Sequence, residues 1–197
     1  MEKVCIVIPA YNEEKRIGRT LEAYSEYFED LRRSKKLDYE MLVVINNATD
    51  KTEEIVRKFA GKNKRILYLN LKPGGKGYAV TEGFKDASKR DNELIGFVDA
   101  DMATSPEEYW KLIGNINNYD GIIASRWRKD SVIKSKQNII SKINSYGFNF
   151  LVKSILFLNF KDTQCGAKLF KKEALADVIK EIGSSKWAWD IELLFKL

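Results

Sequence analysis

The chain of 197 residues contains no histidine, only two cysteines and only three prolines. Without an imidazole, every mechanism that needs a histidine base or a histidine-bound zinc ion is excluded, including Ser-His-Asp hydrolysis. Cys5 and Cys165 both lie among apolar neighbours, and their spacing matches no metal-ligand motif. We therefore expect two small, buried, reduced thiols, as in a cytoplasmic protein.

Long hydrophobic runs and linker-like segments are also missing. No stretch of roughly 18 uncharged apolar residues occurs, so the sequence predicts no membrane-spanning helix. The few prolines and the lack of low-complexity tracts argue against a long linker, and we expect a single domain over residues 1–197. The final "DIELLFKL" stops within the pattern of an amphipathic helix, which leaves two alternatives, a chain trimmed at its C-terminus or a short form.

Basic residues outnumber acidic ones by 34 to 28, and the excess gathers in one stretch. Residues 126–142, "RWRKDSVIKSKQNIISK", hold six basic residues and one acidic residue. Such a stretch is either an ordinary solvated face or a contact for an anionic substrate, an anionic membrane surface or nucleic acid. Nucleic acid is disfavoured because the stretch has Trp127 but no recognisable binding module. The apolar residues 146–160 that follow fit a core helix or a lipid-facing surface.

Short apolar runs alternate with helical patterns along the first 126 residues. We expect strands over residues 4–9, 39–45, 65–71, 94–100 and 121–126, and helices over residues 13–33, 50–61, 77–89 and 105–116. Asp50 with Glu53 is typical of a helix start and Gly61 of a helix stop, and Ser105 before Pro106 marks another start. The alternation predicts an α/β fold, a Rossmann-like and mostly parallel sheet with helices on both faces.

Paired aspartates stand where such a sheet places its ligand. Ligands bind beyond the carboxyl ends of the strands, at the point where the winding reverses. If the strand order is 3-2-1-4, that point lies between "PAYNEE" after the first strand and "DADMAT" after the fourth. If Asp99 and Asp101 are both buried and ionised there, they need cations or hydrogen-bond donors beside them. A bound Mg²⁺ or Mn²⁺ ion would provide the positive charge. Such ions favour a few carboxylates plus substrate phosphates, so the metal implies a phosphate.

The loop "LKPGGKGYAV" supports a phosphate ligand. Gly74, Gly75 and Gly77 would let the backbone approach a ligand closely, and Lys76 offers a cation. The helix that follows would direct its N-terminus at an anion. The loop lacks P-loop spacing, and an ordinary turn is the alternative reading. Together these features predict a nucleoside diphosphate held through a metal ion.

At this point the chain resembles a known family. "IPAYNEE", "VVINNATDKT", "GGKGYAV", "DAD" and "SR", in this order, are similar to family 2 glycosyltransferases with the GT-A fold. "SYGFNFLV", "KDTQCGAKLFKKEA" and "WAWDIELL" resemble dolichyl-phosphate β-glucosyltransferases more than the corresponding mannosyltransferases. The resemblance runs from Val4 to Leu194. It implies an inverting, metal-dependent transfer of a hexose, glucose favoured, from a nucleotide sugar to a dolichyl or polyprenyl phosphate.

The resemblance also implies partners and a location. The donor would be UDP-glucose, with GDP-mannose as the alternative, and the acceptor a polyisoprenyl phosphate. The enzyme would be cytoplasmic and peripheral on the cytosolic face of a membrane, and would bind no nucleic acid.

Some roles follow by position in the matched motifs, and those of Lys76, Arg128, Lys134, Lys136 and Asp190 follow from the chemistry of the residues themselves. The residues expected to bind the nucleotide sugar are Pro9, Tyr11, Glu13, Asn46, Asn47, Lys76, Asp99, Ala100 and Asp101, with Asp99 and Asp101 also holding the metal. The residues expected to bind the acceptor phosphate are Arg126, Arg128, Lys134 and Lys136, and Arg126 would also serve catalysis near the phosphates. Asp190 is the candidate base if the acceptor is a hydroxyl. Lys168 lies in a shared motif, but the sequence gives it no role.

One departure from the family pattern leaves the base of the donor open. The family usually has Asp-Asp after its second strand, where this chain has Asn46-Asn47. Asparagine can accept a hydrogen bond but adds donors and loses the charge. Three alternatives therefore stay in view, namely a transferase with a hydroxyl acceptor, a non-catalytic nucleotide-binding relative and a nucleotide-sugar pyrophosphorylase. The last would need a glycine-rich signature after the first strand, and "PAYNEE" has none.

Overall fold

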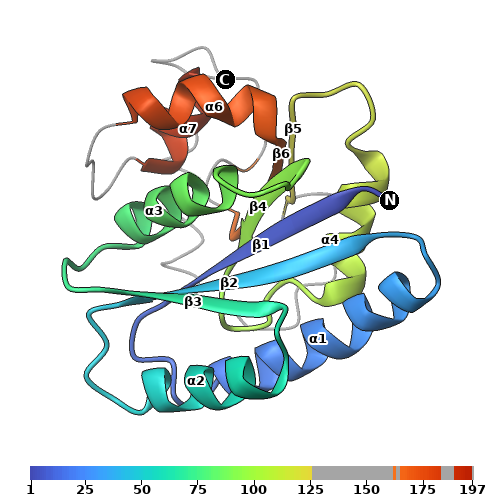
Figure 1. Ribbon diagram of the computed structural model, residues 1–197. Coiled ribbons are helices and arrows are strands. Elements are labelled where there is room, and N and C mark those ends of the chain that lie inside the picture. The colour runs from blue at the N-terminus through green and yellow to red at the C-terminus, as the bar shows by residue number, and fades with distance from the viewer. Residues whose placement is uncertain (126–161, 163–164, 183–188, 197) are drawn as a thin grey trace, which may run out of the picture.

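The structure is a computed structural model, and it describes residues 1–125, 162, 165–182 and 189–196 (Figure 1). The strands are β1 (Lys3–Ala10), β2 (Asp38–Asn46), β3 (Ile66–Leu71), β4 (Leu94–Val98), β5 (Gly121–Ile123) and β6 (Ala167–Lys171). The helices are α1 (Ile17–Arg33), α2 (Thr52–Lys62), α3 (Lys76–Ser88), α4 (Pro106–Asn115), α6 (Lys172–Glu181) and α7 (Trp189–Lys196).

The described strands form a single sheet in the order β3-β2-β1-β4-β6-β5. Strands β1 to β4 are parallel, which confirms the order 3-2-1-4 and places the reversal of winding between β1 and β4. Strand β6 was not predicted, and it pairs antiparallel with both β4 and β5. The expected fifth strand is thus present but shorter than expected, and β6 separates it from β4.

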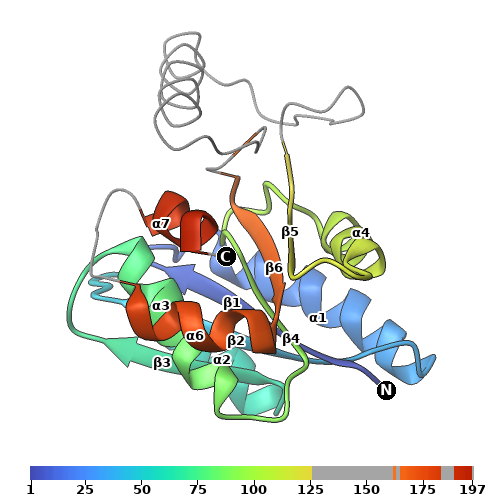
Figure 2. The same cartoon turned by 90° about the horizontal axis from the view of Figure 1, so that it is seen from above.

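Helices cover both faces of the sheet, as predicted (Figures 1 and 2). Alternate residues of β1 show why, since Val4 and Ile6 point into one apolar cluster and Cys5 and Val7 into another. Residues of α1, α2 and α4 complete the first cluster, and residues of α3, α6 and α7 complete the second. Strands buried on both faces read as continuous apolar runs, which is the pattern seen in the sequence.

The helix-end signals were partly wrong. Helix α2 begins at Thr52, and Asp50 lies two residues before it, where its carboxylate accepts hydrogen bonds from the Thr52 N–H and hydroxyl. Gly61 does not stop the helix, which runs one residue further. Ser105 does cap α4, since its hydroxyl accepts a hydrogen bond from the Glu108 N–H, with Pro106 as the first helical residue.

Two further expectations are confirmed. Cys5 and Cys165 are buried and not joined in a disulfide bond, and burial raises the pKa of the Cys5 thiol well above its ordinary value. The last described segment forms α7, with Asp190 and Glu192 in its first turn. None of the helices in the described part of the chain combines the length and the apolar character needed to cross a membrane.

Candidate functional site

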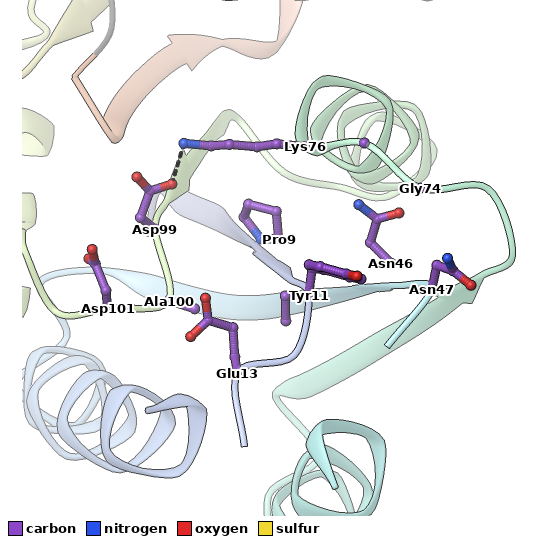
Figure 3. A pocket seen from close by; sticks show the side chains of 12 residues that line it. Pro9, Tyr11, Glu13, Asn46, Asn47, Gly74, Lys76, Asp99, Ala100 and Asp101 are labelled. Atoms are coloured by element: carbon purple, nitrogen blue, oxygen red, sulfur yellow. Dashed lines mark ion pairs between the residues drawn. The ribbon is translucent and has the colours of Figure 1, made fainter. Parts of the chain in front are cut away.

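A pocket of about 560 Å³ opens at the carboxyl ends of β1, β2 and β4 (Figure 3). Its lining residues are Pro9, Ala10, Tyr11, Glu13, Asn46, Asn47, Gly74, Gly75, Lys76, Asp99, Ala100 and Asp101. All nine residues expected at the nucleotide sugar are in this set. The parallel strands therefore bring segments nearly 100 residues apart in sequence to one place, as the topology predicts.

On one side of the pocket lies the carboxylate edge, formed by Asp99 and Asp101 directly after β4. The Lys76 Nζ atom is 2.5 Å from Asp99 Oδ1 (Figure 3). Burial raises the pKa of Asp99 above its ordinary value, with Lys76 opposing the rise and the charges of Asp101 and Asp190 adding to it. The pocket thus presents clustered negative charge that one lysine does not fully offset.

Gly166 supports Asp99 from behind. The Asp99 N–H donates to the Gly166 carbonyl over 2.9 Å. A Cβ atom on Gly166 would lie 2.1 Å from Asp99 Oδ2, so a larger residue would displace the carboxylate. The turn "CGAK" therefore fixes where Asp99 stands.

Helix α1 holds the backbone of the carboxylate edge, and sequence reasoning missed this. The hydroxyl of Thr20, which is fully buried, donates to the Ala100 carbonyl over 2.7 Å. The Tyr24 hydroxyl donates to the Thr104 carbonyl over 3.0 Å. The signal was a threonine on the apolar face of α1, between Ile17 and Leu21, where a polar group needs a partner.

On the other side lies the amide edge, Asn46 and Asn47 at the end of β2 (Figure 3). Asn46 is only 3% exposed, and among the described residues its Oδ1 atom has no hydrogen-bond partner. Asn47 is exposed, takes a positive φ of 55° that asparagine tolerates, and donates its N–H to the Leu71 carbonyl over 2.9 Å. A buried acceptor that faces a pocket without a partner suits a ligand that brings a donor.

The loop after β1 is tied to the loop after β2. The Glu13 N–H donates to the Thr52 hydroxyl over 2.7 Å, and the Thr49 N–H donates to the Asn12 side-chain oxygen over 2.8 Å. The Glu13 carboxylate accepts two hydrogen bonds from Arg16. Tyr11 remains 57% exposed at the mouth of the pocket, so its ring is available to a ligand.

The glycine loop is only partly as predicted. Gly74 and Gly75 line the pocket, and α3 begins at Lys76, so the free N–H groups of its first turn lie at the pocket's edge. Gly77 serves packing instead. A Cβ atom there would lie 2.6 Å from Trp189 Cβ, so the residue is small to admit α7 rather than a ligand.

The remaining expected residues lie apart from this lining. Asp190 stands on α7, and its Oδ1 atom is 2.6 Å from Lys168 Nζ. Lys168, to which the sequence assigned no role, is fully buried. Arg126, Arg128, Lys134 and Lys136 lie outside the described residues, as do residues 146–160.

The carboxylate edge fits a divalent cation. Asp99 and Asp101 provide hard oxygen ligands, and the ion pair with Lys76 balances only one of their two negative charges. Within the ranges that the structure describes, no three acidic or cysteine side chains form a complete metal cage. A cation bound here would take its other ligands from water and substrate, which is how Mg²⁺ commonly binds beside phosphates.

Fold and pocket define an α/β protein with a ligand site at the switch point of its sheet. The model of Glycosyl transferase family 2 matches residues 5–179, and the chain belongs to that family.

Relatives agree with this assignment. The chain is 33% identical to a dolichyl-phosphate beta-glucosyltransferase of Trichomonas vaginalis, covering 97% of this chain and 60% of the relative. It is 29% identical to the dolichyl-phosphate beta-glucosyltransferase of Homo sapiens, covering 98% of this chain and 62% of the relative. The chain thus spans about three fifths of the length of these relatives.

A solved structure shows the same fold. Glucosyl-3-phosphoglycerate synthase from Mycobacterium tuberculosis, in complex with Mn²⁺, UDP and phosphoglyceric acid, superposes with a TM-score of 0.61 at 16% identity. The match covers 88% of this chain and 57% of that one. The expected GT-A fold is confirmed.

Proposed function

We propose that this chain transfers a hexose, with glucose favoured, from a nucleoside diphosphate sugar to a polyisoprenyl phosphate. The observation that carries the proposal is a pocket with clustered carboxylates on one side and a buried, unpartnered amide oxygen on the other. The first suits a metal-bound diphosphate and the second a nucleobase. Membership of the family and the names of the relatives support the reaction and the acceptor.

The diphosphate lies at the carboxylate edge. Asp99 and Asp101 would hold Mg²⁺ or Mn²⁺ there, and the ion would supply positive charge against the diphosphate. Lys76 and the free N–H groups at the start of α3 add positive potential. The sugar is thereby held beyond Asp99 with its leaving group anchored.

The amide edge favours uracil. The Asn46 side chain offers an acceptor and a donor, and uracil offers a matching N–H beside a carbonyl oxygen. Guanine presents two adjacent N–H donors, which a carboxylate would accept better than an amide. Tyr11, exposed at the mouth, can stack on the base. UDP-glucose is therefore the preferred donor, with GDP-mannose as the alternative.

The acceptor phosphate attacks the anomeric carbon of the sugar. A bond forms between a phosphate oxygen and this carbon while the bond to the nucleoside diphosphate breaks, and the leaving group takes the electron pair. Direct displacement on an α-linked donor inverts the carbon and gives a β-linked product. A phosphate monoester, with a second pKa of about 6, is mostly dianionic near neutral pH and needs no base. It needs cations, which Arg126, Arg128, Lys134 and Lys136 would supply at the cytosolic surface of a membrane.

Calorimetry followed by a transfer assay tests the proposal. UDP-glucose, GDP-mannose and a DNA duplex are titrated with and without Mn²⁺, and transfer to a short polyisoprenyl phosphate is then measured. We expect Mn²⁺-dependent binding of UDP-glucose, weaker binding of GDP-mannose, no DNA binding, and transfer to the phosphate. Donor binding without transfer would point to a non-catalytic relative.

A transferase that acts on a hydroxyl is the rival, because the partly exposed Asp190 carboxylate stands near Asp99 and could take the proton. General-base catalysis contributes about 10²–10⁴-fold to rate. With a phosphate acceptor, a folded Asp190→Asn variant should lose less than that. A folded variant that is dead, beside Arg126 and Lys134 variants that work normally, would favour the hydroxyl.

A further inference from the structure

Lys168 is a charged side chain with no exposed surface, and the function proposed above does not use it. Its Nζ atom donates to the Cys165 carbonyl over 2.8 Å and to Asp190 Oδ1 over 2.6 Å. The same atom lies 5.1 Å from the centroid of the Phe97 ring, on the strand that leads to Asp99. Burying a lysine is costly unless it is paired, so this arrangement calls for a reason beyond packing.

Asp190 is held firmly where Lys168 meets it. The preceding residue, Trp189, is 4% exposed, donates its indole N–H to the Thr81 hydroxyl over 2.6 Å, and fills the space left by Gly77. The first turn of α7 is thereby fastened to α3, and Lys168 fastens the next side chain to β6. The Asp190 side chain keeps 26% of its surface exposed.

This location brings a third carboxylate close to the reaction site. Asp190 contacts Lys168, and Lys168 pairs across the sheet with Phe97, two residues before Asp99. Both substrates of the proposed reaction are anions, and an unpaired carboxylate next to their meeting point would repel them. The positive charge of buried Lys168 offsets the negative charge of Asp190 and so reduces that repulsion.

We propose that Lys168 is a positioning residue that fixes Asp190 and balances its charge, so that this third carboxylate does not repel an anionic acceptor. The inference rests on the proposed function, since it assumes an acceptor phosphate. It assigns Lys168 a role in acceptor binding through Asp190, with no contact of its own to substrate. It also predicts that removing the charges of Lys168 and Asp190 together affects acceptor binding less than removing the charge of Lys168 alone.

A charge-balance cycle tests this proposal. The variants are Lys168→Gln, Asp190→Asn and the double variant, because glutamine can still donate to the Cys165 carbonyl while losing the charge. Lys172→Gln is the matched control, since Lys172 is a half-buried lysine that donates to the Arg90 carbonyl away from the pocket. The measurements are acceptor KM and kcat with polyisoprenyl phosphate, donor Kd by calorimetry, and melting temperature.

We expect Lys168→Gln to raise acceptor KM by about tenfold or more, with a smaller change in donor Kd. The double variant should return acceptor KM close to the Asp190→Asn value, and Lys172→Gln should match wild type. An unchanged KM in folded Lys168→Gln, or a double variant no better than Lys168→Gln, overturns the proposal.

Asp190→Asn alone keeps the test decisive if Lys168→Gln does not fold. Removing that negative charge should leave acceptor KM unchanged or lower it, and a tenfold rise would overturn the inference. Wild-type transfer is measured first, and its absence would refute the proposed function rather than the role of Lys168.

Discussion

Asp99 and Asp101 follow β4 on one side of the pocket, while Asn46 and Asn47 lie at the end of β2 on the other. Both pairs lie at the carboxyl end of a buried parallel strand and line the pocket, yet one pair is negatively charged and the other is neutral. The carboxylate edge holds more negative charge than Lys76 offsets, and the amide edge buries a neutral acceptor without a partner. The carboxylate edge can bind a cation and the amide edge can accept a hydrogen bond from a neutral donor group. A metal-bound nucleotide provides both.

The largest expected effect comes from removing charge at the carboxylate edge. Asp101→Asn keeps an oxygen that can accept from the Ala103 N–H but loses the negative charge. Loss of outer-shell partners alone costs about 10–100-fold in metal affinity, so loss of a ligand should weaken Mn²⁺-dependent UDP-glucose binding by at least about 100-fold. Calorimetry measures it, with circular dichroism to confirm the fold.

Asp120→Asn is the control for Asp101→Asn. It removes the same charge from an exposed residue just before β5, at the opposite end of the sheet. The control should bind like wild type. Donor binding by Asp101→Asn that equals wild type in Mn²⁺ would refute the assignment of the metal site.

A steric change at the same edge should have the next largest effect. Gly166→Ala places a methyl group within 2.1 Å of Asp99 Oδ2, so the carboxylate or the turn must move. Overpacking of this kind costs about 1–3 kcal/mol in stability, and we also expect about a tenfold loss of Mn²⁺ affinity. Thermal melting and Mn²⁺ titration followed by electron paramagnetic resonance measure the two effects.

Gly114→Ala is the matched control, because a Cβ atom at Gly114 in α4 meets nothing within 4 Å. Alanine is the better helix former by about 1 kcal/mol, so this control should bind Mn²⁺ normally and melt slightly higher. Equal Mn²⁺ affinity in Gly166→Ala and Gly114→Ala would mean that Gly166 does not place Asp99.

The comparison between the edges also explains what the sequence could and could not reveal. Asn46 ends one apolar run and Asp99 directly follows another, so the topology of a parallel sheet was enough to place both at the ligand site. Lys168 could not be placed, because it lies in β6, a strand whose pairing with β4 joins residues about 70 apart. Gly77 was assigned to the wrong partner, because its neighbour Trp189 is 112 residues away. Contacts made by tertiary packing leave little trace in a local pattern.

A smaller change is expected from exchanging the chemistry of the amide edge. Asn46→Asp loses the amide donor and leaves a carboxylate that only accepts, which suits guanine better than uracil. We expect UDP-glucose affinity to fall about tenfold, the worth of one hydrogen bond, while GDP-mannose loses less or gains. Asn118→Asp, the same change on an exposed turn residue that does not line the pocket, is the control. Parallel losses for both nucleotides in Asn46→Asp would show that Asn46 does not read the base.

The smallest effect is on stability without ligand, and there the two edges should respond with opposite signs to reciprocal exchanges. Burial raises the folded-state pKa of Asp99 above its unfolded value, so ionised Asp99 destabilises the empty protein at neutral pH. Asp99→Asn removes this penalty, and its ion-pair partner Lys76 is 47% exposed and can be solvated. The variant should therefore melt above wild type near pH 7. The gain should shrink as pH falls through the raised pKa of Asp99 and vanish below the unfolded value of about 3.9, where both states are protonated.

Asn46→Asp places a new carboxylate at a position only 3% exposed, so it should melt below wild type near pH 7 and recover toward wild type in acid. Thermal melts of both variants and wild type from about pH 3 to pH 8, without nucleotide or metal, measure the two curves. Asp99→Asn that melts at or below wild type near pH 7, or Asn46→Asp that melts at or above it, would mean that burial does not destabilise a carboxylate at that edge.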